Sequence, residues 1–196
     1  MITRVNKLIA GAALLMTAAA GFAAGPEKGA LPDVPAGQAQ IVVMRSTTVN
    51  ALVSSLLYDV TSGTPKVVGK ISNNRKVVLN VPPGDYVLMV GPMGMFEFMQ
   101  ASVSADKRYF AVVAPVWPAN YFLRPVRHKD SSFLYSSKDF DRLLKKTKLA
   151  DPYTESMDEK EIQKLDEFYR MRWEKWQTKS AEEKLALSIR PEDSFN

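Results

Sequence analysis

The sequence predicts a mainly β fold, an antiparallel β-sandwich of about seven or eight strands followed by a helical C-terminal extension. Two observations lead to this prediction. Short apolar runs rich in β-branched residues alternate with turn residues from Ala39 to Val126, whereas charged residues and helix formers dominate after Ser136. The expected layout is a signal peptide (1–23), a flexible leader (24–37), a β-sandwich domain (38–135) and a helical extension packed on the sandwich (136–196).

The N-terminus has the order of a secretory signal peptide. Arg4 and Lys7 stand without an acidic residue, an apolar run follows over 8–16, and the small residues Gly21 and Ala23 suit a cleavage site. The stretch is rich in alanine, whereas a transmembrane helix needs about 20 strongly apolar residues. We therefore expect cleavage, no membrane span afterwards, and a periplasmic or secreted protein.

Composition narrows the partners and the chemistry. The chain carries 26 basic and 21 acidic residues, a balance that does not indicate a nucleic-acid partner. It contains no cysteine, which excludes disulfides, thiolate catalysis, thiolate metal sites and a lipid anchor through cysteine. Residues 24–37 hold six glycines or prolines without an apolar period, which is typical of a flexible leader.

The strand predictions follow the apolar runs and the turns between them. Turn residues fill 61–65, 72–74, 82–85 and 105–107. Two runs, at Ile41 to Val43 and Phe110 to Ala114, are continuously apolar, so we expect central strands buried on both faces. The predicted strands are 40–44, 54–60, 66–71, 76–81, 86–90, 96–103, 109–116 and 121–126.

Three helices are expected in the extension. Ser136 and Asp139 predict a short helix to about Lys146, before Asp151-Pro152. A capping box at Ser156 to Glu159 predicts the start of a long helix. A second capping box, at Ser180 to Glu183, predicts a short helix that ends before Arg190-Pro191.

The long helix carries an apolar stripe that must be covered. Its members recur at spacings of three and four residues, the period of one helix face. We favour packing of this stripe on one sheet of the same chain; the alternative is a helix for a partner or dimer, with Tyr169, Trp173 and Trp176 as interaction residues. The stripe consists of Ile162, Leu165, Tyr169, Trp173 and Trp176.

Part of the β region resembles a bacterial envelope family. A strand with a glycine (66–71), a second strand (77–81) and the turn Pro83-Gly84-Asp85-Tyr86 resemble PEGA-type and transthyretin-like sandwiches, among them the family catalogued as domain of unknown function 2846. The match covers roughly residues 39–116. It implies a sandwich fold and an envelope compartment, and it brings no catalytic residues. The chain differs from the lipoprotein members in having no cysteine.

Three chemistries can be considered from single segments. Met93, Met95 and Met99 would share one face of an extended strand with Glu97, and clustered thioethers suit Cu(I), although methionine is also a common core filler. Trp117 and Tyr121 flank a turn and could stack on a glycan. His128, beside Asp130 and Ser131, is the single histidine and lacks the pattern of a triad or zinc site.

These observations predict an exported protein that is not an enzyme and has no cofactor and no bound metal. We expect an interaction or structural module in the periplasm of a Gram-negative-type cell, with another envelope protein as the partner. The alternative is a small-ligand binder, for Cu(I) through the methionines or for glycan through the aromatics. A hydrolase that uses His128 is the least favoured reading.

Overall fold

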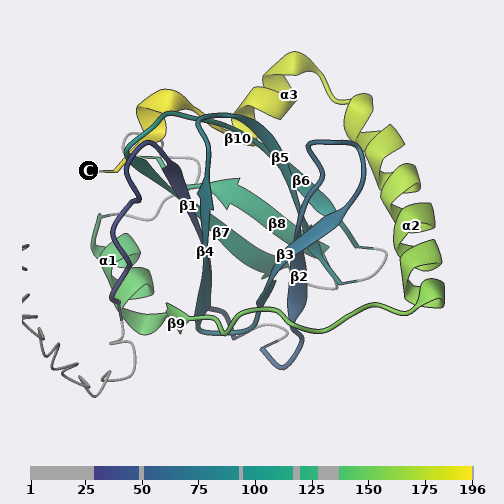
Figure 1. The fold of residues 1–196 in the computed structure, drawn as a ribbon, viewed down its shortest axis with the longest axis horizontal. Coiled ribbons are helices and arrows are strands. Elements are labelled where there is room, and N and C mark those ends of the chain that lie inside the picture. The colour runs from purple at the N-terminus through teal and green to yellow at the C-terminus, as the bar shows by residue number, and fades with distance from the viewer. Residues whose placement is uncertain (1–28, 49–50, 93–94, 117–119, 128–136, 196) are drawn as a thin grey trace, which may run out of the picture.

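The computed structural model describes residues 29–48, 51–92, 95–116, 120–127 and 137–195 (Figure 1). These residues form ten strands in two five-stranded sheets, three α-helices and a 3₁₀ turn. The predicted class, mainly β followed by helices, is confirmed. Each of the eight predicted strands is present, with ends that shift by two residues at most.

The first sheet, sheet A, has its longest strands at its centre. Its strand order is β8-β7-β1-β4-β9. The strands are β1 (Ala39–Arg45), β4 (Arg75–Val81), β7 (Lys107–Val116), β8 (Asn120–Pro125) and β9 (Lys148–Leu149).

The second sheet, sheet B, has the strand order β10-β6-β5-β2-β3. A register shift between Leu57 and Tyr58 leaves Val68 as an extra residue on β3, a β-bulge. The strands are β2 (Ser55–Asp59), β3 (Lys66–Ile71), β5 (Gly84–Gly91), β6 (Glu97–Val103) and β10 (Ser188–Ile189).

Both sheets are mixed, so the prediction of a purely antiparallel sandwich was wrong. Strand β1 pairs antiparallel with β4 but parallel with β7, and β9 and β10 also pair parallel with their neighbours. The parallel pair joins segments 68 residues apart in the chain (Ala39 faces Lys107), and such a pairing leaves no local turn signal. The two-residue strands β9 and β10 were not predicted, because they are too short to show alternation.

Strand β1 is buried on both faces, as its continuous apolar run predicted. Ile41 and Val43 point between the sheets into the inter-sheet core. Val42 and Met44 point the other way, into a second cluster. This cluster also contains Phe110 of β7 and Leu143 of helix α1 (Ser137–Lys146). We call this outer layer of sheet A the α1 cluster.

Helix α2 (Glu159–Gln177) covers the outer face of sheet B. Its apolar residues join Tyr58, Met89 and Phe98 in a third cluster, the α2 cluster. The predicted start at Ser156 was wrong by two residues: Asp158 is the N-cap, and it forms a capping box with Glu161. Both boxes fit the sequence, but Met157 packs into the α2 cluster and so fixes the next residue as the cap.

The last segment crosses the top of the sandwich. Helix α3 (Ala181–Ala186) begins at the predicted capping box of Ser180 and Glu183. The chain then adds β10 to β6 and continues through the 3₁₀ turn Pro191–Asp193 to Phe195, which packs in the α1 cluster. Residues 188–195 thus connect the two sheets, and we call them the strap (yellow in Figure 1).

Part of the predicted leader lies against sheet A. Leu31 packs in the α1 cluster, and the carbonyl of Pro32 accepts a hydrogen bond from Nη2 of Arg108 at 2.6 Å. Gly29 N–H also donates to the carbonyl of Thr147. Residues 29–32 of the predicted leader therefore contact the domain. Among the described residues, no helix has the length and apolar character needed to cross a membrane.

Candidate functional site

Several of the predicted site residues lie outside the described residues. Met93, Trp117 and His128 are among them, as are the neighbours of the histidine, Asp130 and Ser131. Tyr121 belongs to β8, but its side chain is not described. The copper, glycan and hydrolase hypotheses therefore depend on residues of which the structure gives no side-chain geometry.

The remaining methionines of the copper hypothesis do not share an open face. Met99 is fully buried in the inter-sheet core, among Leu88, Val90 and Leu123. Met95 is half-buried ahead of strand β6. Phe98 points to the opposite face of β6, into the α2 cluster, as strand alternation predicted. The thioether of Met99 fills the core, the common role of methionine.

The interaction candidates of α2 contact their own chain. The rings of Tyr169, Trp173 and Trp176 lie 6.2, 5.4 and 5.7 Å from the ring of Phe98, measured between centroids. Tyr169 and Trp176 are buried, whereas Ile162 is 53% exposed although it was predicted in the same stripe. The first buried residue of the stripe within the helix is therefore Leu165 rather than Ile162.

Glu97 lies between β8 and α2 in a basic environment. Burial raises the pKa of its carboxyl, against the lowering effect of Arg124 on β8 and of Lys179, Arg172 and Lys175 near the end of α2. The guanidinium of Arg124 in turn stands 4.4 Å from the ring centroid of Phe122. Burial lowers the pKa of Arg124, and the charge of Glu97 opposes this shift. Glu97 and Arg124 thus form a partly buried pair of ionisable side chains.

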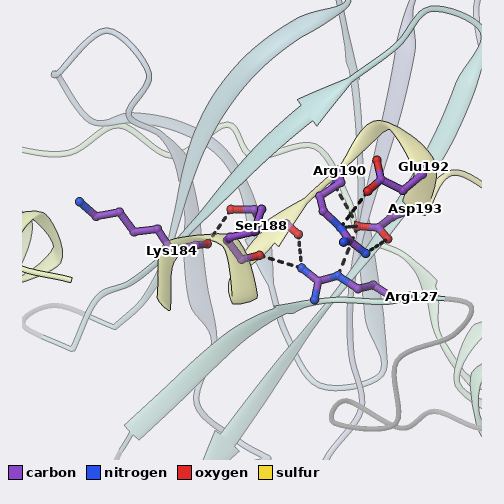
Figure 2. Close-up of polar contacts among 7 residues, drawn as sticks. Arg127, Lys184, Ser188, Arg190, Glu192 and Asp193 are labelled. Carbon is purple, nitrogen blue, oxygen red and sulfur yellow. Dashed lines mark hydrogen bonds and ion pairs between the residues drawn. The ribbon is translucent and has the colours of Figure 1, made fainter. Parts of the chain in front are cut away.

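A cluster of polar side chains holds the strap in place (Figure 2). Arg127 Nη2 donates to the carbonyls of Ser188 and Leu185 at 2.6 and 2.9 Å, and its Nε lies 3.3 Å from Oδ2 of Asp193. Asp193 also accepts from the backbone N–H and the guanidinium of Arg190. The side chains of Arg127 and Asp193 are 8% and 5% exposed. The hydrogen bonds of these residues join them to one another and to the backbone of the strap. We call this structural cluster the latch.

A second buried cation anchors helix α1. Lys76 of β4 has no exposed surface, and its Nζ donates to the carbonyl of Leu144 at 3.3 Å. Thr147 donates its hydroxyl to the carbonyls of Leu143 and Leu144. These carbonyls belong to the last turn of α1, where a cation also complements the helix dipole. Burial lowers the pKa of Lys76.

A recess between the strands β3 and β4 reaches residues of the inter-sheet core. This recess, which we call the edge slot, has a volume of about 310 Å³. Its floor contains the core residues Ile41 and Leu88, and Asp59, Lys66 and Asn80 lie at its rim. The walls are formed by Val68, Val78, Leu79, Val81 and Tyr86.

At one end of the edge slot, near Gly69, the two sheets approach each other closely and close the recess. A Cβ atom on Gly69 of β3 would stand 2.7 Å from Cγ1 of Val77 on β4, so only glycine fits there. The bulge at Val68 follows directly and turns β3 away from β4. The sheets therefore touch at Gly69 and separate toward Lys66.

A wider groove borders the strap. It has a volume of about 650 Å³, and it runs between the outer face of β5 and β6 and the segment from Leu185 to Glu192. Asp85, Gln100 and Ser102 supply polar groups, and Leu185 is 54% exposed at its border. In the described part of the chain, no group of three or more His, Asp or Glu residues has metal-site geometry.

No protein-family model matches the chain, and no curated protein sequence matches it. The resemblance to envelope sandwiches thus stays an expectation from the motif at 66–86. Sequence reasoning missed the edge slot and the latch. The one signal for the slot is the glycine of the Val-Val-Gly-Lys run of β3, because an interior glycine in a strand indicates close backbone approach.

Proposed function

We propose that this protein is an exported, non-enzymatic interaction module of the cell envelope, in the periplasm of a Gram-negative-type cell, with another envelope protein as its partner. Export is supported by the signal-peptide order of residues 1–23. The role as an interaction module is supported by the resemblance of residues 66–86 to envelope sandwiches and by the two-sheet fold of the described residues.

The edge slot is the observation that carries the interaction role. The outer face of sheet A is covered by α1, Leu31 and Phe195, and much of the outer face of sheet B is covered by α2. Between β3 and β4, in contrast, core residues line an open recess. A partner that binds there gains apolar burial without displacing any described element, and burial of apolar surface drives most protein association.

Cell fractionation and intact-mass measurement test the export step. The form recovered from the periplasm is expected to begin between Gly21 and Gly25. A chain that retains Met1 and stays in the cytoplasm contradicts export.

Photocrosslinking in living cells tests the interaction role. A photoreactive amino acid in place of Lys66, at the rim of the edge slot, is expected to form an adduct of one defined mass with an envelope protein. The same substitution at Lys164, on the exposed side of α2, is the control and is expected to form none. Equal adducts at both positions, or none at Lys66, contradict the proposed role of the slot.

A further inference from the structure

We propose that the free edge of strand β4 binds an extended segment of the partner protein as an added β-strand, whose apolar side chains enter the edge slot. This inference deepens the proposed interaction role and rests on it. It names the kind of partner segment: an extended polypeptide with alternating apolar residues and acidic flanks.

The edge of β4 has room for a strand beyond the short strand β9. Strand β9 pairs only with Arg75 and Lys76, and no other described strand lies on that side of β4. Two hydrogen bonds mark the groups that point outward: Lys148 N–H donates to Asn74, and Ala150 N–H donates to the carbonyl of Lys76 at 2.8 Å. Backbone direction alternates along a strand, so the amides and carbonyls of Val78 and Asn80 point to the same side.

This edge is not protected as edge strands usually are. Natural sheets guard their free edges with lysines, prolines or bulges, because a bare edge pairs with other chains. The neighbouring edge strand β3 follows that rule with Lys66, Lys70 and a bulge. The free part of β4, residues 77–81, contains no charged residue and no proline. Its unguarded state fits an edge that is kept open for binding.

The edge slot supplies the side-chain pockets that strand addition requires. In this mode of recognition, backbone hydrogen bonds give affinity, and pockets for alternate side chains give specificity. Val78 and Asn80 line the slot together with Leu79 and Val81 of the same strand, so the slot runs along the free edge. A strand added beside β4 would direct every second side chain between the sheets, toward Ile41 and Leu88.

The charges at the rim favour a partner over a second copy of this chain. Lys66 is exposed, and it makes no hydrogen bond or ion pair within the described residues. The carboxylate of Asp59 keeps its charge but is oriented by the backbone N–H and hydroxyl of Thr61, which donate to it at 2.9 and 2.6 Å. The pairing edge of a second copy, Arg75–Val81, carries two basic residues and no acidic one, so it would not complement Lys66, whereas acidic residues beside an added partner strand would.

Amide hydrogen exchange, followed by NMR on the purified chain, tests the proposal. The probe is an acetylated and amidated seven-residue peptide with three valines alternating with two threonines and a glutamate at each end. At about 1 mM peptide, we expect exchange at Val78 and Asn80 to slow by about tenfold or more. Val77 and Leu79 are expected to change little, because their amides already face β1. The control peptide has the same sequence except that prolines replace its three valines.

Two variants connect the protection to the edge. Asn80→Lys places a charge on the free edge of β4 and is expected to abolish the slowing of exchange by the peptide. Gln163→Lys adds the same charge on the exposed side of α2, and the slowing is expected to remain. If Asn80→Lys does not fold, Asn80→Pro removes the outward amide at an edge position where proline is tolerated.

Three results overturn the proposal: no protection at either amide, equal protection by the proline peptide, or protection that survives both Asn80 variants. Protection that appears without peptide and rises with protein concentration assigns the edge to a second copy instead. Each result is independent of where the chain is found in the cell. Failed export would therefore refute the proposed function and leave the strand-binding proposal intact. Failed protection would refute only the strand-binding proposal.

Discussion

Trp176 and Phe98 lie with their ring centroids 5.7 Å apart, and this contact joins the end of helix α2 to strand β6. Both side chains are almost fully buried, at 2% and 3% exposure. The aromatic rings of Tyr169 and Trp173 complete the same cluster around Phe98. Helix α2 is therefore part of the domain, and its removal would expose the outer face of sheet B.

The first prediction concerns this contact. Trp176→Ala is expected to lower the free energy of unfolding by about 3–5 kcal/mol, because it removes a large buried ring and leaves a cavity. Urea denaturation followed by circular dichroism measures the change. The control is Arg170→Ala on the exposed face of α2, expected to change stability by less than about 1 kcal/mol. A loss below about 1 kcal/mol for Trp176→Ala would mean that α2 is not docked in solution.

The second prediction concerns the latch. Asp193→Asn leaves the guanidinium of Arg127 buried without its carboxylate, and breaking a buried pair typically costs about 3–5 kcal/mol. Glu192→Gln is the control, because the side chain of Glu192 is 63% exposed and exposed ion pairs contribute little. Thermal unfolding compares the variants. Equal melting temperatures for the two would show that the latch does not hold the strap.

The third prediction concerns pH. Burial raises the pKa of Glu97 above its ordinary 4.5, so the folded state binds the proton more tightly than the unfolded state. The stability that this group contributes is complete below pH 4.5, and it is lost as pH rises through the folded-state pKa. Glu97→Gln mimics the protonated form and lacks this loss. Its melting temperature, relative to that of the unchanged protein, should therefore be higher at about pH 7 than at about pH 4.

A control and a contrary outcome complete this test. Glu174→Gln removes a carboxylate on the exposed side of α2, and its difference from the unchanged protein should depend less on pH. If instead the relative stability of Glu97→Gln falls as pH rises, the basic groups around Glu97 outweigh its burial.

The fourth prediction concerns the close approach of the sheets. Gly69→Ala forces a Cβ to within 2.7 Å of Val77, and overpacking of this kind costs about 1–3 kcal/mol. Val77→Ala alone also destabilises, because it removes buried methyl groups. Combined, the two changes relieve the clash, so the double variant should be more stable than the sum of the single losses predicts. Additive losses in chemical denaturation would show that the sheets do not touch at this point.

The strands of the sandwich could be predicted because local signals mark them. Apolar runs between turn residues fixed all eight longer strands, and the continuous run of β1 correctly indicated burial on both faces. The second capping box placed α3 correctly for the same reason, since Ser180 and Glu183 are close in sequence.

The features that could not be predicted depend on contacts between distant residues. The parallel pairing of β1 with β7 and the two-residue strands β9 and β10 have no local pattern. Ile162 has the correct helical spacing, yet it is exposed, because burial depends on which residues of sheet B the helix meets. The edge slot likewise arises from how two sheets separate beyond Gly69, which no single segment encodes.

The strap also has a consequence for the order of folding. Ile189 belongs to the inter-sheet core, and Phe195 packs against Phe110 and Phe140 on the opposite side of sheet A, near Leu31. Segments from both ends of the described chain thus meet on one surface, and the long sequence separation of these contacts slows folding. The contacts of Ile189 and Phe195 can form only after residue 195 has been synthesised, so the strap is the last part of the domain to pack.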